Sequence, residues 1–378
     1  MRDTWDVLVV GAGPAGASAA LGTLAARPRA RVLLLDRADF PRDKSCGDGI
    51  APHVLDALAP VGAADVVAGW APVHRLSLRR GGAVVDRDMR RPAYVVPREV
   101  FDARLVERAV AAGATLLRHK VREVAVRSDR VEVDGYAAAV VVGADGAHSV
   151  VRPRPKGRRA LAIRGYTPTR PEWAGRQLIV YGERRQPSYA WAFDRGDGLT
   201  NVGYGEIVDD ARPVSRDVLL GELADLLPGS VSHGRAWRAH HLPLSGWRWA
   251  QPDGRVLLAG DAAGLVNPMS GEGIFYAVAT GLSAGRAAVS GPPGHAGRRH
   301  REAVRTVLDG HLRHTTVASR LASVGAVVDA GIRAAAADPG IFDDLVEIGL
   351  GRGRITPALA GGLVRGLAGG LRPFRSGE

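Results

Sequence analysis

Short apolar runs that end at glycine or aspartate recur along the chain. Each covers four or five residues, which is too short for a typical helix. Such runs are typical of strands buried on both faces of a parallel sheet. The segment between the first two runs is rich in alanine and predicts a helix packed close to that sheet. The runs are Asp6–Val10, Arg31–Leu35, Ala139–Val142 and Val256–Ala259, and the alanine-rich segment is Ala15–Ala26.

The middle of the chain shows a looser alternation of apolar and polar residues. His74–Leu78 and Ala83–Asp86 are joined by two arginines and two glycines, which predicts a hairpin. More short segments of this kind follow, separated by glycine or proline. We therefore predict an antiparallel sheet inserted into the α/β fold, with one face forming the wall of a pocket. The further strands are Gln177–Tyr181, Tyr189–Phe193, Leu199–Tyr204 and Ala236–Leu244.

The C-terminal region is mostly helical by its pattern. Arg298–Ala337 has helical periodicity, and Ile355–Phe374 is apolar with repeated glycines and a few arginines. The second segment is too short and interrupted to span a bilayer. It could pack on the core or lie on a membrane surface, and packing is the favoured interpretation. The start of the chain has neither a signal-peptide nor an anchor pattern.

The first apolar run leads into a glycine triplet that indicates a dinucleotide site. Gly11, Gly13 and Gly16 form G-x-G-x-x-G between a strand and a helix, and Asp36 ends the next strand twenty positions after Gly16. The glycines allow a tight turn, close approach of the backbone to a pyrophosphate, and helix–strand contact. Asp36 can accept hydrogen bonds from ribose hydroxyls and disfavours a 2′-phosphate. The predicted contacts here are Gly11, Gly13, Ala15, Gly16, Asp36 and Arg37.

Two later strands end in similar turns. The first turn, Gly143–Gly146, supplies Asp145 and Gly146, and the second supplies Gly260 and Asp261. In an open α/β sheet, ligands bind at this carboxyl edge. A helix is predicted to begin near Gly271–Gly273, and its positive end, up to Ile274, could face a ligand that gains negative charge.

These three motifs, in this order, resemble FAD-dependent oxidoreductases of the para-hydroxybenzoate hydroxylase type, and most closely the geranylgeranyl reductase family. Lys44–Pro52 is similar to that family's cysteine-glycine loop, and Ala93–Ala114 to its strand, flavin-contacting arginine and helix. Pro187–Gly205 resembles its aromatic substrate-cavity segment, and Gly260–Ala277 its second FAD motif. The similarity runs from about residue 5 to about residue 290. Asp194 departs from the family, which often has proline there, and this puts the shape of the cavity wall in doubt.

The resemblance implies a fold, a cofactor and a reaction. The expected fold is α/β: a Rossmann-like FAD-binding domain, an inserted antiparallel β-sheet substrate domain and a helical C-terminal region. The reaction implied is reduction of C=C bonds in a prenyl-type hydrophobic substrate, by hydride from N5 of reduced FAD. Because there is no second glycine-triplet domain, NAD(P)H or another reductant would bind only transiently. The expected domains are 1–70, 93–160 and 250–295 for FAD, 71–92 and 161–249 for substrate, and 296–378 for the helices.

The substrate side centres on an aromatic strand and the lone cysteine. Alternation puts Tyr189, Trp191 and Phe193 on one strand face, as an apolar wall or as ordinary core packing. Cys46 could relay the alkene proton with a lowered pKa, fix the loop or the substrate, or be merely small. The further flavin contacts expected are Cys46, Gly47, Arg98, Asp261, Gly271, Gly273 and Ile274. The expected catalytic residues are Cys46, Tyr189 and Trp191, and the substrate contacts are Tyr189, Trp191, Phe193 and Asn201.

Composition narrows the setting. The single cysteine fits a reducing cytoplasm. The net charge of +12 comes from dispersed arginines, which argues against nucleic-acid binding and leaves peripheral contact with an anionic membrane open. We expect no metal site and leave the oligomeric state open. The alternative functions are an FAD-dependent monooxygenase or tailoring oxidoreductase acting on an aromatic or polyketide-like product, and a regulatory flavin-binding protein.

Overall fold

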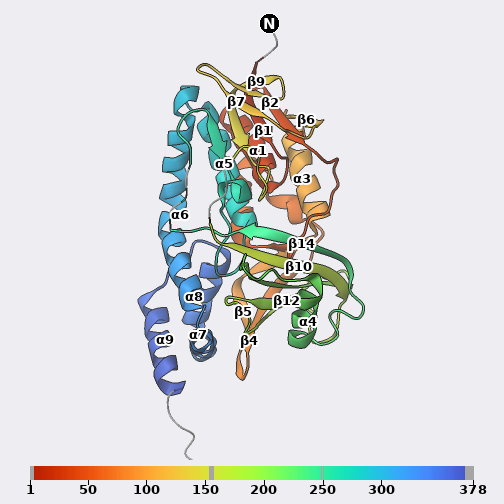
Figure 1. Cartoon of the computed structure of the whole chain (residues 1–378), viewed down its shortest axis with the longest axis vertical. Coiled ribbons are helices and arrows are strands. Elements are labelled where there is room, and N and C mark those ends of the chain that lie inside the picture. Colours follow the sequence, from red (N-terminus) through yellow and green to blue (C-terminus); the bar gives the residue numbers. More distant parts are fainter. Residues whose placement is uncertain (1–3, 153–156, 248, 250, 371–378) are drawn as a thin grey trace, which may run out of the picture.

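Two sheets and a group of C-terminal helices make up the fold (Figure 1). The computed structural model describes residues 4–152, 157–247, 249 and 251–370. The first sheet lies at the top of Figure 1, the second sheet below it, and the C-terminal helices run down the left side.

The first sheet has seven strands in the order β6-β2-β1-β9-β8-β7, with β15 paired to β9. Strands β6, β2, β1, β9 and β15 are parallel, and β7 and β8 form an antiparallel extension. The central residues Val7–Val9 and Leu33–Leu35 are almost fully buried, as expected for strands covered on both faces. The bounds are β1 Trp5–Val10, β2 Val32–Asp36, β6 Thr115–Arg118, β7 Val124–Val126, β8 Val131–Val133, β9 Tyr136–Gly143 and β15 Val256–Leu258.

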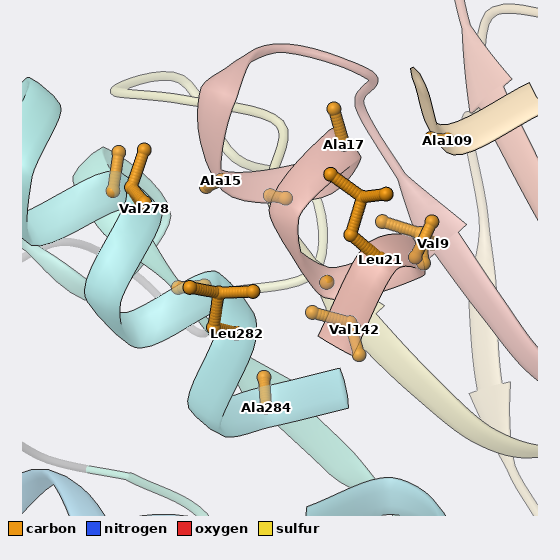
Figure 2. Close-up of a cluster of buried hydrophobic side chains, with 14 of the residues drawn as sticks. Val9, Ala15, Ala17, Leu21, Ala109, Val142, Val278, Leu282 and Ala284 are labelled. Atoms are coloured by element: carbon orange, nitrogen blue, oxygen red, sulfur yellow. The ribbon is translucent and has the colours of Figure 1, made fainter. Parts of the chain in front are cut away.

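Helices α1 and α5 pack against each other more closely than ordinary side chains would allow. An added Cβ at Gly281 or Gly285 of α5 would collide with backbone oxygens of α1, and one at Gly22 of α1 with the backbone of α5. Figure 2 shows the small and apolar side chains of both helices beside β1 and β9. The glycines therefore set the distance between the two helices. The helices of this part are α1 Pro14–Ala26, α2 Pro52–Leu58, α3 Arg98–Ala111 and α5 Ile274–Val289.

The second sheet has eight strands in the order β14-β10-β13-β12-β11-β4-β5-β3. Helix α4, Arg216–Leu226, covers one face through Leu219 and Leu223. The two-residue strand β3 joins the sheet by pairing with the end of β5. The bounds are β3 Gly49–Ile50, β4 Pro72–Arg80, β5 Ala83–Val95, β10 Arg159–Pro168, β11 Arg176–Tyr181, β12 Tyr189–Asp194, β13 Leu199–Ile207 and β14 Arg235–Pro243.

The C-terminal helices connect the two sheets. Helix α6, Ala296–Leu321, runs beside α5, while α7, Gly325–Ala337, packs on β4 and β5. Helices α8, Pro339–Leu350, and α9, Pro357–Gly370, pack on α7 and on each other. Their apolar side chains join those of β4 and β5 in one cluster. No helix within the described residues is long and apolar enough to cross a membrane.

The α/β class, the inserted sheet and the helical C-terminal region are confirmed. The second sheet contains one parallel pair of strands, β4 with β11. The alternation of apolar and polar residues could not predict this pair, because the two strands lie about a hundred residues apart in the chain. The helical periodicity of Arg298–Ala337 is confirmed, and the segment forms two helices, α6 and α7, that are separated by a turn at Ala322–Val324. Residues 371–374 of the predicted apolar helix lie outside the described residues.

The close approach of α1 and α5 predicts that one added methyl group between the two helices lowers the stability of the fold. Gly285→Ala should lower the free energy of unfolding by about 2 kcal/mol, because the helices must separate. Gly221→Ala is the matched control, since this glycine of α4 has nothing within 4 Å of its added Cβ. The control should gain about 0.5–1 kcal/mol of helix propensity. Urea unfolding of both variants measures the difference, and equal stability of the two would contradict the packing argument.

Candidate active site

A continuous cavity of about 860 Å³ connects the carboxyl edge of the first sheet with the C-terminal helices. One end is bordered by Gly11, Gly13 and Asp36. The middle passes Cys46 and the aromatic strand β12, and the far part runs between the second sheet and helices α6–α9. The two sheets and the helices therefore share one cavity.

The nucleotide end has the features that a dinucleotide requires. Gly11 adopts a φ of 93°, which favours glycine. An added Cβ at Gly13 would meet only the guanidinium of Arg42, at 3.3 Å, so the backbone here is open to a ligand. The first N–H groups of α1 have no partner within the helix and can donate to a diphosphate. The residues present thus fit the diphosphate of FAD.

Asp36 connects the loop that follows β1 with the loop that follows β2. It is buried, its Oδ2 accepts a hydrogen bond from the Ala12 N–H at 2.8 Å, and its Oδ1 accepts one from the Ala38 N–H at 2.9 Å. These bonds fix the carboxylate beside the glycine turn, where lone pairs remain for ribose hydroxyls. Arg37 follows on the exposed side and also borders the cavity.

A buried ion pair between an arginine and an aspartate lies at the middle of the cavity. Arg98 and Asp102, four residues apart on α3, form two hydrogen bonds of 2.6 and 2.7 Å. Arg42 approaches the same carboxylate at 3.3 Å. Since one carboxylate faces two guanidinium groups, positive charge remains for an anionic ligand. Arg98 was predicted here, whereas Arg42 was missed, because no local motif accompanies it.

Asp261 is paired with a lysine in this structure. Lys44 Nζ lies 3.2 Å from its Oδ2. Burial opposes ionisation of Asp261, but Lys44 and neighbouring charges outweigh it and lower the pKa of the carboxyl. Burial and Lys44 also lower the pKa of the nearby His240 to about 4, so this imidazole is neutral at pH 7. The pair joins the cysteine loop, Lys44–Pro52, to the third motif, Gly260–Ala277. The flavin contact expected for Asp261 stays a prediction.

The side-chain amide of Asn201 holds the cysteine loop, Lys44–Pro52, in place. Asn201 Nδ2 donates to the Cys46 carbonyl and to Asp48 Oδ2, both at 2.8 Å. Its Oδ1 accepts from Trp191 Nε1 at 2.8 Å, and Tyr166 donates a further bond of 2.6 Å to Asp48. Asn201 itself is fully buried. This network holds the loop against the aromatic strand.

Burial raises the pKa values of Cys46 and of two acidic side chains near it. It raises the pKa of the Cys46 thiol despite the nearby Arg98 guanidinium, so the expected lowering of that pKa is wrong. Burial also raises the pKa of Asp48 to about 6 and that of Glu272 to about 7. Cys46 is therefore a neutral thiol at pH 7. That form can donate a proton but is a poor nucleophile.

The aromatic side chains of β12 form the cavity wall. Tyr189, Trp191 and Phe193 follow one another with ring centroids 6.0 and 6.4 Å apart, and all three border the cavity. An added Cβ at Gly203 would collide with the Trp191 indole, so this glycine lets the ring lie on β13. The Tyr189 hydroxyl donates to the Ser270 carbonyl, which ties the wall to the third motif. That proton is engaged, so the geometry supports positioning rather than proton transfer for Tyr189.

Three predicted contacts lie outside the cavity lining. Gly16 packs under Gly11, and Gly260 packs between α1 and α5. Asn201 shares a sheet face with Phe193, its partner in register, but the cysteine loop covers it. The direct substrate contact suggested for Asn201 has no support in this geometry. The predicted residues that do line the cavity are Gly11, Gly13, Ala15, Asp36, Arg37, Cys46, Gly47, Arg98, Asp145, Gly146, Tyr189, Trp191, Phe193, Asp261, Gly271, Gly273 and Ile274.

Asp194, where the sequence departs from the family, lies outside the cavity lining. Its carboxylate accepts from the Gly175 and Gly196 N–H groups at 2.6 and 3.0 Å and from Thr169, at the end of β12. Asp194 therefore fixes turns beside the sheet.

Glu272 is a residue whose role the sequence did not reveal, although it stands between two glycines of the third motif. Among the described residues, no group of three or more His, Cys, Asp or Glu side chains could hold a metal.

Comparison with known proteins identifies the family. A family model described as "FAD binding domain" matches residues 4–160. Menaquinone reductase of Mycolicibacterium smegmatis is 35% identical over 321 residues, which cover 77% of this chain and 78% of that protein. Digeranylgeranylglycerophospholipid reductase 1 of Methanopyrus kandleri is 33% identical, over 75% and 80% of the two chains. Geranylgeranyl diphosphate reductase of Rhodobacter capsulatus is 31% identical, over 76% and 75%.

The chain belongs to the geranylgeranyl reductase family. It is an FAD-dependent oxidoreductase. The fold agrees: a geranylgeranyl bacteriochlorophyll reductase-like protein from Thermoplasma acidophilum superposes with a TM-score of 0.75 at 20% identity, over 97% of this chain and 96% of that one. The halogenase PltM superposes with a TM-score of 0.67 at 16% identity, over 91% and 79%. At these identities the two structures show the fold alone.

The raised pKa of Glu272 predicts a pH-dependent stability in this reductase-family protein. The folded state binds this proton more tightly than the unfolded chain, with a pKa of about 7 against 4.5. Stability from Glu272 is therefore complete below about pH 4.5 and lost as the pH rises through about 7. Glu272→Gln removes the titration and keeps an acceptor oxygen for the Phe275 N–H.

Melting temperatures of the flavin-free protein and of Glu272→Gln test this sign. Between about pH 5 and about pH 8, the melting temperature of the variant should gain roughly 2 °C or more relative to wild type. A difference that stays constant over this range, or that moves the other way, would contradict the raised pKa.

Proposed function

We propose that this protein reduces carbon–carbon double bonds in the prenyl chain of a hydrophobic substrate. The observation that carries the proposal is the long apolar limb of the cavity. Beyond the aromatic wall, the lining passes to aliphatic side chains of the second sheet and the C-terminal helices. These include Leu76, Leu78, Ile179, Val328, Ile332, Leu345 and Leu363. A flexible hydrocarbon chain gains free energy by leaving water for such a surface.

The curated relatives support the same substrate class. Menaquinone, geranylgeranyl diphosphate and digeranylgeranylglycerophospholipid, the compounds in the relatives' names, all carry isoprenoid chains. They differ in their head groups. The head group of the substrate is thus open, whereas the chain is the shared feature that an apolar limb can hold.

The chain's own residues supply enclosure, orientation and a proton. Reduced FAD would supply the hydride at its N5 position. An isolated alkene has no polar group to assist that transfer, so exclusion of water and placement of the chain carry much of the rate. Trp191 and Phe193 would flank the chain beside Cys46, whose neutral thiol is the candidate proton donor. NAD(P)H, or another reductant that binds transiently, would reduce the flavin between turnovers.

Product masses test the proposed reaction. The reduced enzyme is incubated without oxygen with prenyl diphosphates, prenylated lipids and isoprenoid quinones. A product two mass units heavier for each reduced bond is expected. Products that gain oxygen, formed only when air is admitted, would instead establish the competing monooxygenase function.

Chain-length selection tests the assignment of the apolar limb. Gly331 of α7 borders the cavity, and its added Cβ would meet only Leu363 Cδ2, at 3.5 Å. Gly331→Leu should therefore occupy the limb and lower kcat/KM for the longest accepted chain by roughly tenfold, while a short chain is little affected. Gly331→Ala is the matched control and should lie close to wild type. An equal loss for short and long chains would contradict this placement.

A further inference from the structure

Three segments far apart in the sequence lie around the start of α7, and Figure 1 draws the β4–β5 hairpin and α9 at the lower end of the molecule. They are the tip of the β4–β5 hairpin, the corner between α6 and α7, and the last turns of α9. Arg80 of the hairpin pairs with Asp329 of α7 at 2.7 Å, and its guanidinium covers Gly325, the first residue of α7. The hairpin tip is therefore fixed against the start of α7.

Helix α9 brings its last turns to the same place. An added Cβ at Gly362 would meet Ala334, and one at Gly366 would meet Ala330. The contact on α7 moves toward its start as α9 advances, so the two helices are antiparallel. The end of α9 consequently lies beside the start of α7 and the α6–α7 corner.

Exposed apolar and basic side chains gather at this end. Val84 of the hairpin, Val324 of the corner and Val364 of α9 are 47%, 53% and 67% exposed. Leu321, at the end of α6, is also exposed. Arg320 and Arg365 stand next to these residues, are exposed, and have no carboxylate partner among the described residues. We call Val84, Arg320, Leu321, Val324, Val364 and Arg365 the distal patch.

The apolar limb of the cavity ends at this patch. Leu321 borders the cavity and is also 40% exposed, so only this side chain separates the cavity from the surface there. Val327 and Leu363, which neighbour the distal patch on α7 and α9, border the cavity as well. The patch thus lies over the end of the cavity that is opposite to the nucleotide end.

We propose that the distal patch docks on an anionic lipid bilayer, so that a prenyl chain passes from the membrane directly into the apolar limb. The valines and Leu321 would enter the boundary between head groups and acyl chains, and the two arginines would contact phosphates. A second copy of this chain fits less well, since a symmetric contact would bring the four arginines of the two patches into one interface. The inference deepens the proposed function, because it names where that substrate enters.

Vesicle flotation of the flavin-loaded protein tests the docking. The vesicles are phosphatidylcholine alone or phosphatidylcholine mixed with phosphatidylglycerol. Wild type should bind the anionic vesicles and bind the neutral ones at least fivefold more weakly, as expected for two arginines near the surface. Val324→Glu/Val364→Glu should weaken binding to anionic vesicles by roughly tenfold.

The matched control carries the same charge change at the other end of the molecule. Val110→Glu/Val126→Glu alters two valines, 44% and 61% exposed, on α3 and β7, and should bind vesicles as wild type does. Turnover of a short prenyl substrate in detergent should be equal in both variants, since none of the four valines borders the cavity. Vesicle binding without turnover would overturn the proposed function and leave the docking intact.

Three results would overturn the docking itself. Wild type could fail to bind anionic vesicles, or both double variants could lose binding equally. In the third, sedimentation would show that Val324→Glu/Val364→Glu breaks a dimer while vesicle binding is unchanged. The last result would identify the patch as an interface between copies.

Discussion

The contact between α1 and α5 is the constraint on which the rest of the structure depends. Gly22, Gly281 and Gly285 allow the two helices to approach until backbone meets backbone. The start of α1 carries the first glycine motif, and the start of α5 carries the third. Their packing therefore brings the two motifs, more than 250 positions apart in the chain, to the same cavity, which Gly11, Gly13, Gly271 and Gly273 all border. A looser helix pair would separate the two halves of the cofactor site.

The cysteine loop depends on a second connection, between the two sheets. Asn201 ties the loop to β13 and to Trp191, while Lys44 ties it to Asp261 of the first sheet's edge. The loop is thus held between the nucleotide end and the aromatic wall. Cys46 occupies the point where cofactor and substrate would meet, as a neutral thiol in a buried setting. Fixing this loop matters because catalysis depends on the placement of groups to within about 1 Å.

The sequence predicted those parts of the site that are local in the chain. The first two glycines of the motif, Asp36 and the aromatic alternation of β12 follow from short-range spacing, and each lines the cavity. Arg42 escaped prediction because its position depends on Asp102, sixty residues away. Glu272 and Asp48 stand beside glycines of recognisable motifs, but their raised pKa values come from burial by other segments. The role of Asn201 was misjudged since alternation assigns a sheet face but cannot show that a distant loop covers it.

The central claim is that one cavity joins the FAD site to a limb that holds a prenyl chain. Rapid mixing of the fully reduced enzyme with a prenyl substrate, in the strict absence of oxygen, measures this most directly. The account predicts that the flavin spectrum returns to the oxidised form, with one double bond reduced for each flavin. Flavin that stays reduced with every prenyl substrate, and is oxidised only when oxygen is admitted, would contradict it.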